Sequence, residues 1–408
     1  MHVPLFPNKS FVCNNGTRNP GHFWPASAAV LRWRLMIRVL LVFGTRPEAI
    51  KLCPLYRCLS ACADFQARVC VTAQHRDMLD QVLATFRVAP HHDLDLMLPS
   101  QTLAQSTSRI LSALEPVLAS DRPDLVVVQG DTTTTLAAAM AAFYQKVPVG
   151  HVEAGLRTGD MLQPFPEEMN RVVATRLASQ HFAPTEWAAR NLLAEGVDPA
   201  SVHVTGNTGI DAVLQVSAGL AAGQLRGRPW PELDGSRKLI AVTAHRRESF
   251  GVGFDEICNA LARLAARPDV RIVYPVHRNP NVREQVTARL AGLPGVILTE
   301  PLDYVAFVDL MRRAWLLITD SGGVQEEGPS LGKPILVMRE KTERPEAVEA
   351  GTVKLVGANQ DRIVAEAERL LDDPAEYARM TRVHNPYGDG HACERITEAI
   401  RRYFSKKA

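Results

Sequence analysis

The sequence predicts an α/β protein with two domains, each built on a parallel sheet that carries helices on both faces. From Met36 onward, short runs rich in β-branched residues alternate with longer segments of helical periodicity, an order typical of such sheets. The chain has 408 residues, which is long for a single hydrophobic core. Segments 205–210 and 219–231, the latter rich in Gly, Pro and Arg, separate two series of strands, so we place the domain junction near Gly206.

The strands are expected in two series. The first comprises residues 38–43, 66–72, 125–129, 147–152 and 181–183, and the second 239–243, 271–275, 296–298, 316–319 and 335–337. A helix with Pro47 as its first residue, ending near Leu59, is expected after the first strand, because proline suits the first helical position. An amphipathic helix over residues 394–404 closes the chain. The predicted domains are residues 36–205 and 206–383, followed by a crossover segment, 384–408.

Residues 1–35 are expected to be an extension with little structure of its own. They are rich in Pro, Asn and Gly, and Arg32 and Arg34 interrupt their only apolar stretch. That pattern matches neither a signal peptide nor a membrane helix, so we expect a cytoplasmic protein that does not enter a membrane. The net charge of +2 is too small for the electrostatic footprint of a nucleic-acid binder.

The cysteines predict no metal site. No C-x-x-C pair occurs, and no histidine follows at zinc spacing, so we expect reduced thiols and a protein that needs neither metal nor other cofactor. The seven cysteines are Cys13, Cys53, Cys58, Cys62, Cys70, Cys258 and Cys393.

Polar clusters follow five of the predicted strands. In open α/β sheets, ligands bind outside the carboxyl ends of the strands. These clusters come from both halves of the chain, so together they predict one ligand-binding cleft between the domains. They are residues 44–48, 130–132, Glu153, 245–248 and 320–323.

The segment 321–327 is the best candidate for an anion site. Gly322 and Gly323 would let backbone N–H groups approach a phosphate at a helix start, after Ser321. Glu327 lies one turn further, where a carboxylate can accept hydrogen bonds from ribose hydroxyls. The alternative is a tight turn in which Ser321 merely caps the helix.

Cations near the start of the first helix point to the same ligand. Arg46 and Lys51 are disfavoured at the positive end of a helix, so an anion such as a diphosphate is expected to offset them. Alternatively, Glu48 pairs with one of them.

Three carboxylates are candidates for acid–base work. Asp131 could instead cap the following helix, and Glu167 could simply favour the first turn of its own. Glu153 has no such alternative, because an acid at the end of an apolar strand is costly unless it is used. His245 likewise ends a strand among cations.

Ten longer motifs stand along the chain in a recognisable order. They are GTRPEAIK (44–51), QHRDMLDQVL (74–83), GDTTTTLA (130–137), GHVEAGLRTGD (150–160), PFPEEMNR (164–171), HRRESFG (245–251), YPVHRNPNVRE (274–284), DSGGVQEEGPSLGKP (320–334), TERPEAV (342–348) and HNPYGDG (384–390). Together these motifs resemble the non-hydrolysing UDP-N-acetylglucosamine 2-epimerases, from about Met36 to Arg402. Two features depart from that family: residues 1–35 have no counterpart, and Arg278 follows His277 where an apolar residue is common.

This resemblance implies a fold similar to the two-domain glycosyltransferases of the B type, with the last helix crossing back to the first domain. It implies conversion of UDP-GlcNAc to UDP-ManNAc for surface polysaccharides, by elimination of UDP and re-addition through 2-acetamidoglucal, in a homodimer. The diphosphate would be bound by Arg46, Lys51, His245, Arg344 and residues 321–323, and the acid–base groups would be Asp131, Glu153 and Glu167. Phe307 and the segment 300–307 would hold the uracil.

The resemblance also implies regulation. One diphosphate does not need all the cations of the expected cleft, and family members bind a second UDP-GlcNAc beside the active site. The candidate residues for that second site are Gln74, Asp77, Arg247 and His277. Three other functions compete: a retaining glycosyltransferase, a hydrolysing epimerase that releases free ManNAc and UDP, and a regulator that only binds a sugar nucleotide.

Overall fold

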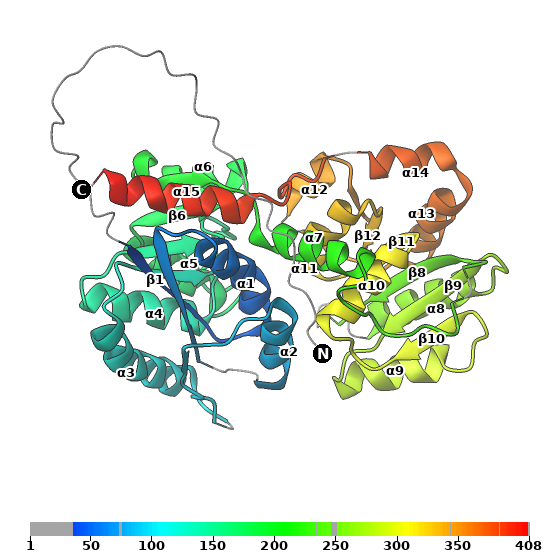
Figure 1. Ribbon diagram of the computed structural model, residues 1–408. Coiled ribbons are helices and arrows are strands. Elements are labelled where there is room, and N and C mark those ends of the chain that lie inside the picture. The colour runs from blue at the N-terminus through cyan, green and yellow to red at the C-terminus, as the bar shows by residue number, and fades with distance from the viewer. Residues whose placement is uncertain are drawn as a thin grey trace, which may run out of the picture. The chain divides into compact units, whose positions relative to one another are not determined.

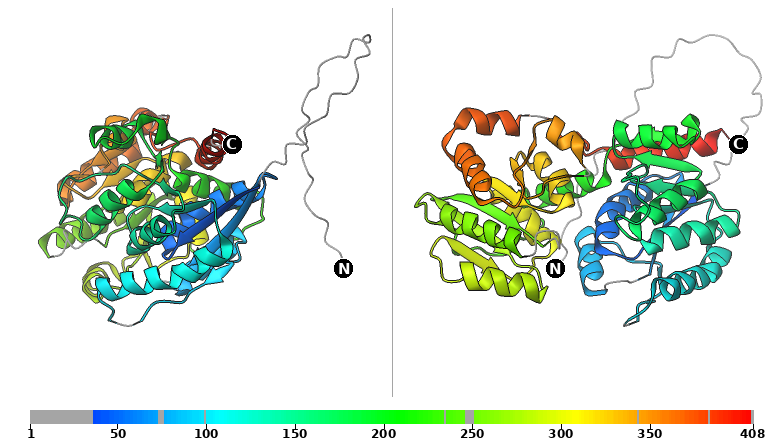
Figure 2. Two further views of the ribbon diagram at one scale, coloured as in Figure 1. Left: turned by 90° about the vertical axis from the view of Figure 1, so that its left-hand side faces the viewer. Right: turned by 180° about the vertical axis from the view of Figure 1, so that it is seen from behind.

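The computed structural model describes residues 36–72, 76–98, 100–233, 235–245, 251–342, 344–382 and 384–406, which belong to one compact unit beginning at Met36. Two parallel sheets with helices on both faces make up this unit (Figures 1 and 2). The fold class predicted from the sequence is therefore confirmed. In the described part of the chain, no helix is both long and apolar enough to span a membrane.

The first sheet has the strand order β3-β2-β1-β4-β5-β6-β7. Its strands are β1 (Ile37–Phe43), β2 (Phe65–Val71), β3 (His92–Asp93), β4 (Leu125–Gln129), β5 (Val149–Val152), β6 (Gln180–Ala183) and β7 (Val202–Val204). Its connections contain α1 (Arg46–Ser60), α2 (Arg76–Phe86), α3 (Leu103–Asp121), α4 (Thr133–Tyr144), α5 (Glu167–Leu177), α6 (Glu186–Ala194) and the short helix η1 (Pro199–Ser201).

The second sheet has the order β10-β9-β8-β11-β12-β13 and follows α7 (Thr208–Ala221). Its strands are β8 (Lys238–Thr243), β9 (Val270–Pro275), β10 (Val296–Thr299), β11 (Leu316–Thr319), β12 (Ile335–Val337) and β13 (Val353–Leu355). The helices around it are α8 (Val252–Ala265), α9 (Pro280–Leu290), α10 (Tyr304–Arg313), α11 (Gly322–Glu327), η3 (Gly328–Leu331), α12 (Pro345–Glu349), α13 (Gln360–Asp372) and α14 (Pro374–Thr381).

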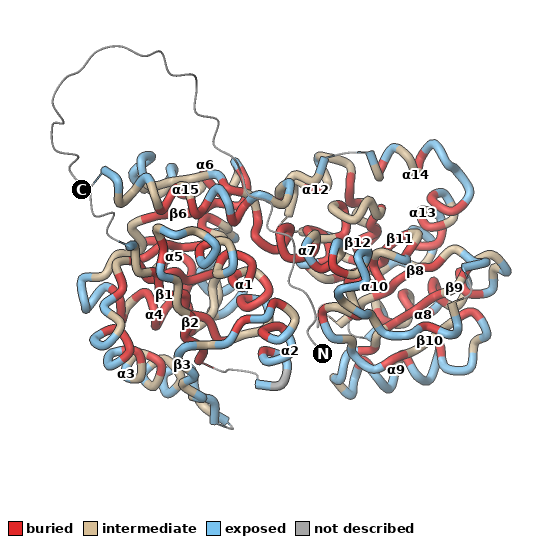
Figure 3. The backbone as a smooth tube through the Cα atoms, viewed as in Figure 1, coloured by how far each residue is buried: buried red, intermediate tan, exposed pale blue. Residues whose placement is uncertain are grey.

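Alternation along β1 shows how helices come to cover both faces of the first sheet. Leu41 and Phe43 belong to the core cluster that contains the apolar residues of α1, α2 and α15 (Ala392–Ser405). Leu40 and Val42 belong to the opposite cluster, with α3 and α4. Because successive side chains of a strand point to opposite faces, a continuous apolar run is buried on both. Figure 3 shows the resulting buried strands between partly exposed helices.

The last helix returns to the first sheet, as the resemblance implied. α15 lies beside α1 in Figure 1, and Arg401 Nε donates to Asp64 Oδ2 at 2.6 Å, just before β2. The start of α15 is held from α7, because Asp211 accepts hydrogen bonds from the backbone N–H groups of Ala392 and Cys393 at 3.2 and 2.9 Å. A carboxylate at this position stabilises the N–H groups of a first helical turn.

All ten predicted strands are present, and the differences are local. β5 begins at Val149 rather than at 147, because Pro148 has no N–H to donate to a sheet ladder. α1 begins at Arg46, so Pro47 is its second residue. The strands β3, β7 and β13 were not predicted, because each is a short edge strand without the continuous apolar run that marks the equally short β12. The proposed domain boundaries at Gly206 and His384 stay predictions.

Candidate functional site

Strand order brings the predicted site residues together in pairs of loops. In the first sheet β1 pairs with β4, and in the second β8 pairs with β11; these are the points where each strand order reverses. Such switch points are the usual ligand sites of open parallel sheets. The loop with Arg46 therefore lies next to that with Asp131, and the strand end with His245 next to that with Asp320.

Glu48 connects the loop after β1 to the loop after β4 by hydrogen bonds. Its buried carboxylate accepts hydrogen bonds from Gly44 N at 3.0 Å and Thr45 N at 2.8 Å, and from the Thr132 hydroxyl at 2.7 Å across the sheet. The sequence left open whether Glu48 pairs with Arg46 or Lys51. Its carboxylate is instead used to cap α1 and to fix the start of α4, which sets the positions of Arg46 and Asp131.

Asp131 does not cap α4. Thr132 is the N-cap, and its side chain accepts from Thr135 N, so the structural alternative for Asp131 is wrong. Asp131 Oδ2 instead lies 2.8 Å from Arg171 Nη2 of α5, and the Asp131 carbonyl accepts from Asn170 Nδ2 at 2.9 Å. Burial raises the pKa of Asp131, although Arg171 opposes the shift. A carboxyl group with a raised pKa is suited to both accept and donate a proton.

Glu153 is held in an unusual backbone conformation. Its φ is +65°, in the left-handed region that residues other than glycine rarely adopt. Glu153 Oε2 lies 2.5 Å from Lys51 Nζ and also accepts from Gln129 Nε2. Burial raises the pKa of Glu153, and Lys51 opposes the shift. Strain of this kind persists where surrounding contacts enforce it, often at active sites.

Lys51 connects the two halves of the site. Besides Glu153, its Nζ lies 3.9 Å from Glu326 Oε2 of α11, beside the second sheet. Burial alone would lower the pKa of Lys51, but the charges of Glu153 and Glu326 outweigh burial and raise it. The ammonium group is therefore charged and shared between carboxylates of the two halves.

The start of α11 has the form expected of an anion site. Ser321 precedes the helix without a capping side-chain hydrogen bond, so the alternative role suggested for it is not seen. Arg344 lies against Gly322: a Cβ on residue 322 would be only 2.6 Å from Cζ of Arg344, so any larger residue there would push the guanidinium away. Arg344 Nε in turn donates to Glu326 Oε1 at 2.6 Å. A guanidinium and the first N–H groups of a helix are thus adjacent, which favours a phosphate.

His245 is oriented by Asp320. Its backbone N–H donates to Asp320 Oδ2 at 2.7 Å, and its Nδ1 lies 3.3 Å from Asp320 Oδ1. The ring of His277 stacks on that of His245, with centroids 5.5 Å apart and planes 17° apart. His277, predicted for a second ligand, therefore contacts a residue predicted for the first.

The remaining predicted residues lie on nearby elements. Glu167 is the first residue of α5, and its charge acts on Asp131. Glu327 ends α11; burial and the neighbouring charge of Glu326 raise its pKa to about 8. Phe307 lies in α10, partly buried against the main core. Gln74, Arg247 and the side chain of Asp77 lie outside the described residues.

Two residues of this site were not singled out from the sequence. Arg171 holds Asp131, and Glu326 holds Lys51 and Arg344. Asp320 belongs to the predicted cluster 320–323, but its role of orienting His245 was not predicted. Arg171 stands four residues after Glu167, one turn along the same helix, and Glu326 directly precedes Glu327. Proximity to predicted site residues was the only available signal, and proximity along the chain does not show which partner a side chain meets.

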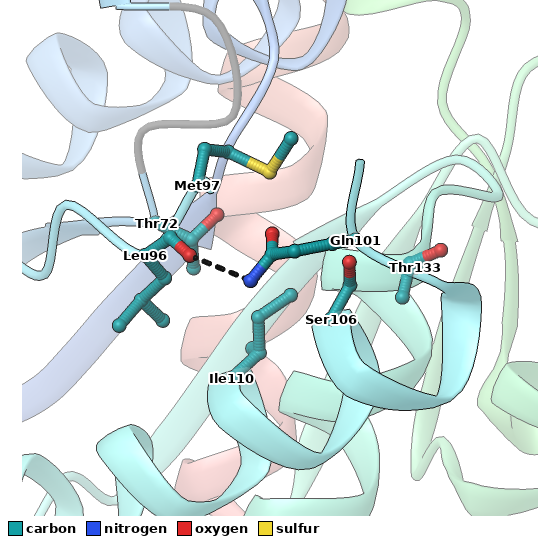
Figure 4. A pocket seen from close by; sticks show the side chains of 7 residues that line it. All are labelled: Thr72, Leu96, Met97, Gln101, Ser106, Ile110 and Thr133. Atoms are coloured by element: carbon teal, nitrogen blue, oxygen red, sulfur yellow. Dashed lines mark hydrogen bonds between the residues drawn. The ribbon is translucent and has the colours of Figure 1, made fainter. Parts of the chain in front are cut away.

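A small cavity lies at the carboxyl end of β2, next to the site loops (Figure 4). Its volume is about 10 Å³, and Thr72, Gln101, Ile110 and Thr133 are among the residues that line it. Gln101 Nε2 donates to the Leu96 carbonyl across it at 3.3 Å. A cavity of this size has room for about one water molecule. It is too small for a nucleotide.

Comparison with known proteins agrees with this geometry. Residues 57–401 match the family model described as UDP-N-acetylglucosamine 2-epimerase. The chain is 57% identical over 370 residues to the UDP-N-acetylglucosamine 2-epimerase of Escherichia coli (strain K12), covering 90% of this chain and 98% of that protein. The corresponding enzyme of Salmonella typhimurium is 56% identical over 372 residues, covering 90% and 99%.

Solved structures give the same result. The Neisseria meningitidis UDP-GlcNAc 2-epimerase bound to UDP-GlcNAc is 46% identical, with a TM-score of 0.84 and coverage of 90% of this chain and 100% of that one. The Methanocaldococcus jannaschii enzyme in complex with UDP-GlcNAc and UDP is 33% identical, with a TM-score of 0.74 and the same coverage.

Proposed function

Because this chain belongs to the UDP-N-acetylglucosamine 2-epimerase family, we propose that it interconverts UDP-GlcNAc and UDP-ManNAc by inverting C2 of the sugar. One observation carries the proposal beyond the family: Lys51 joins the strained carboxylate Glu153 to Glu326, which holds Arg344 against the start of α11. This contact supports the proposal, because it links a residue proposed for acid–base chemistry in the first half to residues proposed for the diphosphate site in the second.

The substrate dictates the route. No carbonyl group adjoins C2, so its proton is not acidic enough for simple removal. We propose that the C1–O bond breaks with its electron pair leaving on UDP, while the C2 proton passes to a carboxylate and a C1=C2 double bond forms. The 2-acetamidoglucal then receives a proton on the opposite face of C2, and the UDP oxygen bonds C1 again.

Carboxylates from neighbouring strand ends suit the two proton transfers. Asp131 and Glu153 follow β4 and β5, which pair directly, and Glu167 is close enough to act on Asp131. Burial raises the pKa of both Asp131 and Glu153, which favours their exchanging protons with a substrate. We propose that these three residues serve the two faces of C2.

The departing diphosphate needs positive charge, and several cations predicted for the site could supply it. We propose that Arg46, Lys51, His245 and Arg344 bind the diphosphate together with the N–H groups of residues 321–323. Fixed donors aimed at a leaving anion stabilise it in the transition state. Glu327 would accept hydrogen bonds from the ribose hydroxyls, and Phe307 with segment 300–307 would hold the uracil.

A second UDP-GlcNAc is part of the proposal. His277 contacts His245 by stacking, so a ligand on His277 lies beside the first diphosphate. We propose that Gln74, Asp77, Arg247 and His277 bind this activator, and that the enzyme works as a homodimer. Sedimentation of the protein with and without UDP-GlcNAc tests the dimer directly.

Incubation of the protein with UDP-GlcNAc alone tests the main proposal. Proton NMR should show UDP-ManNAc accumulating to an equilibrium mixture, with no free sugar. Free ManNAc and UDP would identify a hydrolysing enzyme. Absence of any product, with turnover only when an acceptor sugar is supplied, would identify a glycosyltransferase; binding without turnover would identify a regulator.

A further inference from the structure

Glu326 occupies a central position for which the proposed reaction gives no role. It is 4% exposed. Its carboxylate accepts from Arg344 Nε at 2.6 Å and from Asn207 Nδ2, the N-cap of α7, at 2.9 Å. Lys51 Nζ, from α1, lies 3.9 Å away. One buried carboxylate thus contacts the first helix, the connection between the sheets, and the segment before α12.

These contacts form a row of alternating charges. Glu153 pairs with Lys51, Lys51 reaches Glu326, and Glu326 pairs with Arg344 beside Gly322. Buried charges are tolerated when each is paired, and removing one member leaves its neighbours uncompensated. A change at either end of the row must therefore alter the charge balance at the other.

We propose that Glu326 is a positioning residue for the epimerisation, which shares Lys51 with Glu153 and holds Arg344 at the diphosphate site. This inference rests on the proposed function. Glu326 limits how strongly Lys51 stabilises the charged form of Glu153, so Glu153 keeps the ability to exchange a proton. The same carboxylate fixes the guanidinium that meets the departing diphosphate.

The charged groups around Glu153 give the direction of the effect. Lys51 faces it from α1, Asp131 from the loop after β4, and Glu326 from α11. Burial raises the pKa of Glu153, Lys51 lowers it, and the negative charges of Glu326 and Asp131 raise it further. Glu326 itself also faces Arg344, and it acts on Glu327 and Tyr387. If Glu326 were neutral, Lys51 would interact with the charge of Glu153 alone, and the pKa of Glu153 would fall.

The test is Glu326→Gln in the full chain. We expect kcat/KM to fall roughly 10- to 100-fold, as when a hydrogen bond to a charged group is lost. The limb of the pH–rate profile that Glu153 controls should move to lower pH, whether Glu153 acts as base or as acid. Carbon NMR of side-chain carboxyl groups, with Glu153 assigned by its Gln variant, should show the same downward movement in unliganded protein.

Glu376→Gln is the matched control. Glu376 is 7% exposed and lies 2.6 Å from Arg379 and 3.5 Å from Arg369, on the outlying helix α14. The Glu376→Gln variant loses a paired carboxylate whose burial is similar to that of Glu326, yet its pH–rate profile should keep the shape of the parent's. Glu326→Asp keeps the charge but moves it back by one methylene group, so the limb of the pH–rate profile that Glu153 controls should move in the same direction by a smaller amount. This variant serves as the test if Glu326→Gln does not fold.

The possible failures can be told apart. If the parent protein makes no UDP-ManNAc, the proposed function is wrong, and the NMR titration still decides on the coupling between Glu326 and Glu153. If the parent is active but Glu153 has the same pKa in Glu326→Gln and Glu326→Asp as in the parent, Glu326 is only structural and the inference is overturned. Movement of the limb to higher pH would overturn it as well.

Discussion

The Nζ of Lys51 lies 2.5 Å from Oε2 of Glu153, a residue 102 positions further along the chain. A cation expected to bind the diphosphate thus contacts a carboxylate expected to move the C2 proton. Any ligand that draws Lys51 toward itself weakens its hold on Glu153. In the proposed reaction, binding of the leaving group and the charge state of Glu153 are therefore linked through one ammonium group.

Loss of Lys51 should act in the opposite direction to loss of Glu326. In Lys51→Met the positive charge that lowers the pKa of Glu153 is gone, so that pKa rises and the corresponding limb of the pH–rate profile should move to higher pH. Turnover at neutral pH should fall about 100-fold, since a diphosphate contact is also lost. Lys354→Met removes a lysine paired with Glu366, away from the site, and should leave the profile unchanged.

Neutral versions of the acid–base carboxylates should separate binding from chemistry. Asp131→Asn and Glu153→Gln should still bind UDP in calorimetry, because most of the residues proposed to contact the nucleotide belong to the second half. Their kcat should fall by ~10²–10⁴-fold, as when a general acid or base is removed. Asp124→Asn, at a carboxylate paired with Arg38 at the other end of the sheet, is the control. Near-parental turnover in either site variant would remove that residue from the mechanism.

Solvent labelling should reveal the elimination. When the reaction runs in heavy water, UDP-ManNAc should carry deuterium at C2, because the proton leaves from one face and a new one arrives on the other. Mass spectrometry and proton NMR of the product measure this. Product that retains the original hydrogen would indicate oxidation and reduction at a neighbouring carbon instead.

Stability of the unliganded protein should depend on Glu327. Burial and the charge of Glu326 raise the pKa of Glu327 to about 8. A raised folded-state pKa favours the folded protein fully below the unfolded value near 4.5, and that contribution is lost as pH rises through about 8. Between pH 5 and pH 9 the Tm of the parent should therefore fall by a few degrees (~2–4) relative to Glu327→Gln.

The control for that measurement is Glu340→Gln, at a carboxylate whose side chain is 76% exposed. Its Tm should follow that of the parent at every pH. A constant difference between the parent and Glu327→Gln across the range would show that Glu327 ionises normally in the folded protein.

Binding of a second UDP-GlcNAc should make the kinetics cooperative. Initial rates should depend sigmoidally on UDP-GlcNAc, because a ligand that binds the active conformation better shifts the population toward it. The reverse reaction from pure UDP-ManNAc should be slow and should speed up when a trace of UDP-GlcNAc is added. Arg247→Ala should make both curves hyperbolic. Hyperbolic kinetics already in the parent would leave Arg247 and Gln74 as surface groups without this role.

The fold and the approximate place of the site could be predicted from the sequence because both depend on local patterns. An apolar run such as residues 125–129 predicts a buried parallel strand, and a polar residue directly after it, such as Asp131, must then lie at the carboxyl edge of a sheet. The closing helix was recognisable from its amphipathic period alone. Each of these conclusions requires only residues that are neighbours along the chain.

Only the tertiary structure decided which charges meet. Arg171 rather than a helix end holds Asp131, and Lys51 lies between Glu153 and Glu326, which are far apart in sequence. These pairs depend on which strands are neighbours and on how α11 approaches α1. The burial that shifts the pKa values of Glu153 and Glu327 depends on the same packing. The sequence by itself therefore determined which residues stand at the strand ends, whereas three-dimensional packing decided how they share charge, because electrostatic interactions depend on distance in space and on exclusion of water.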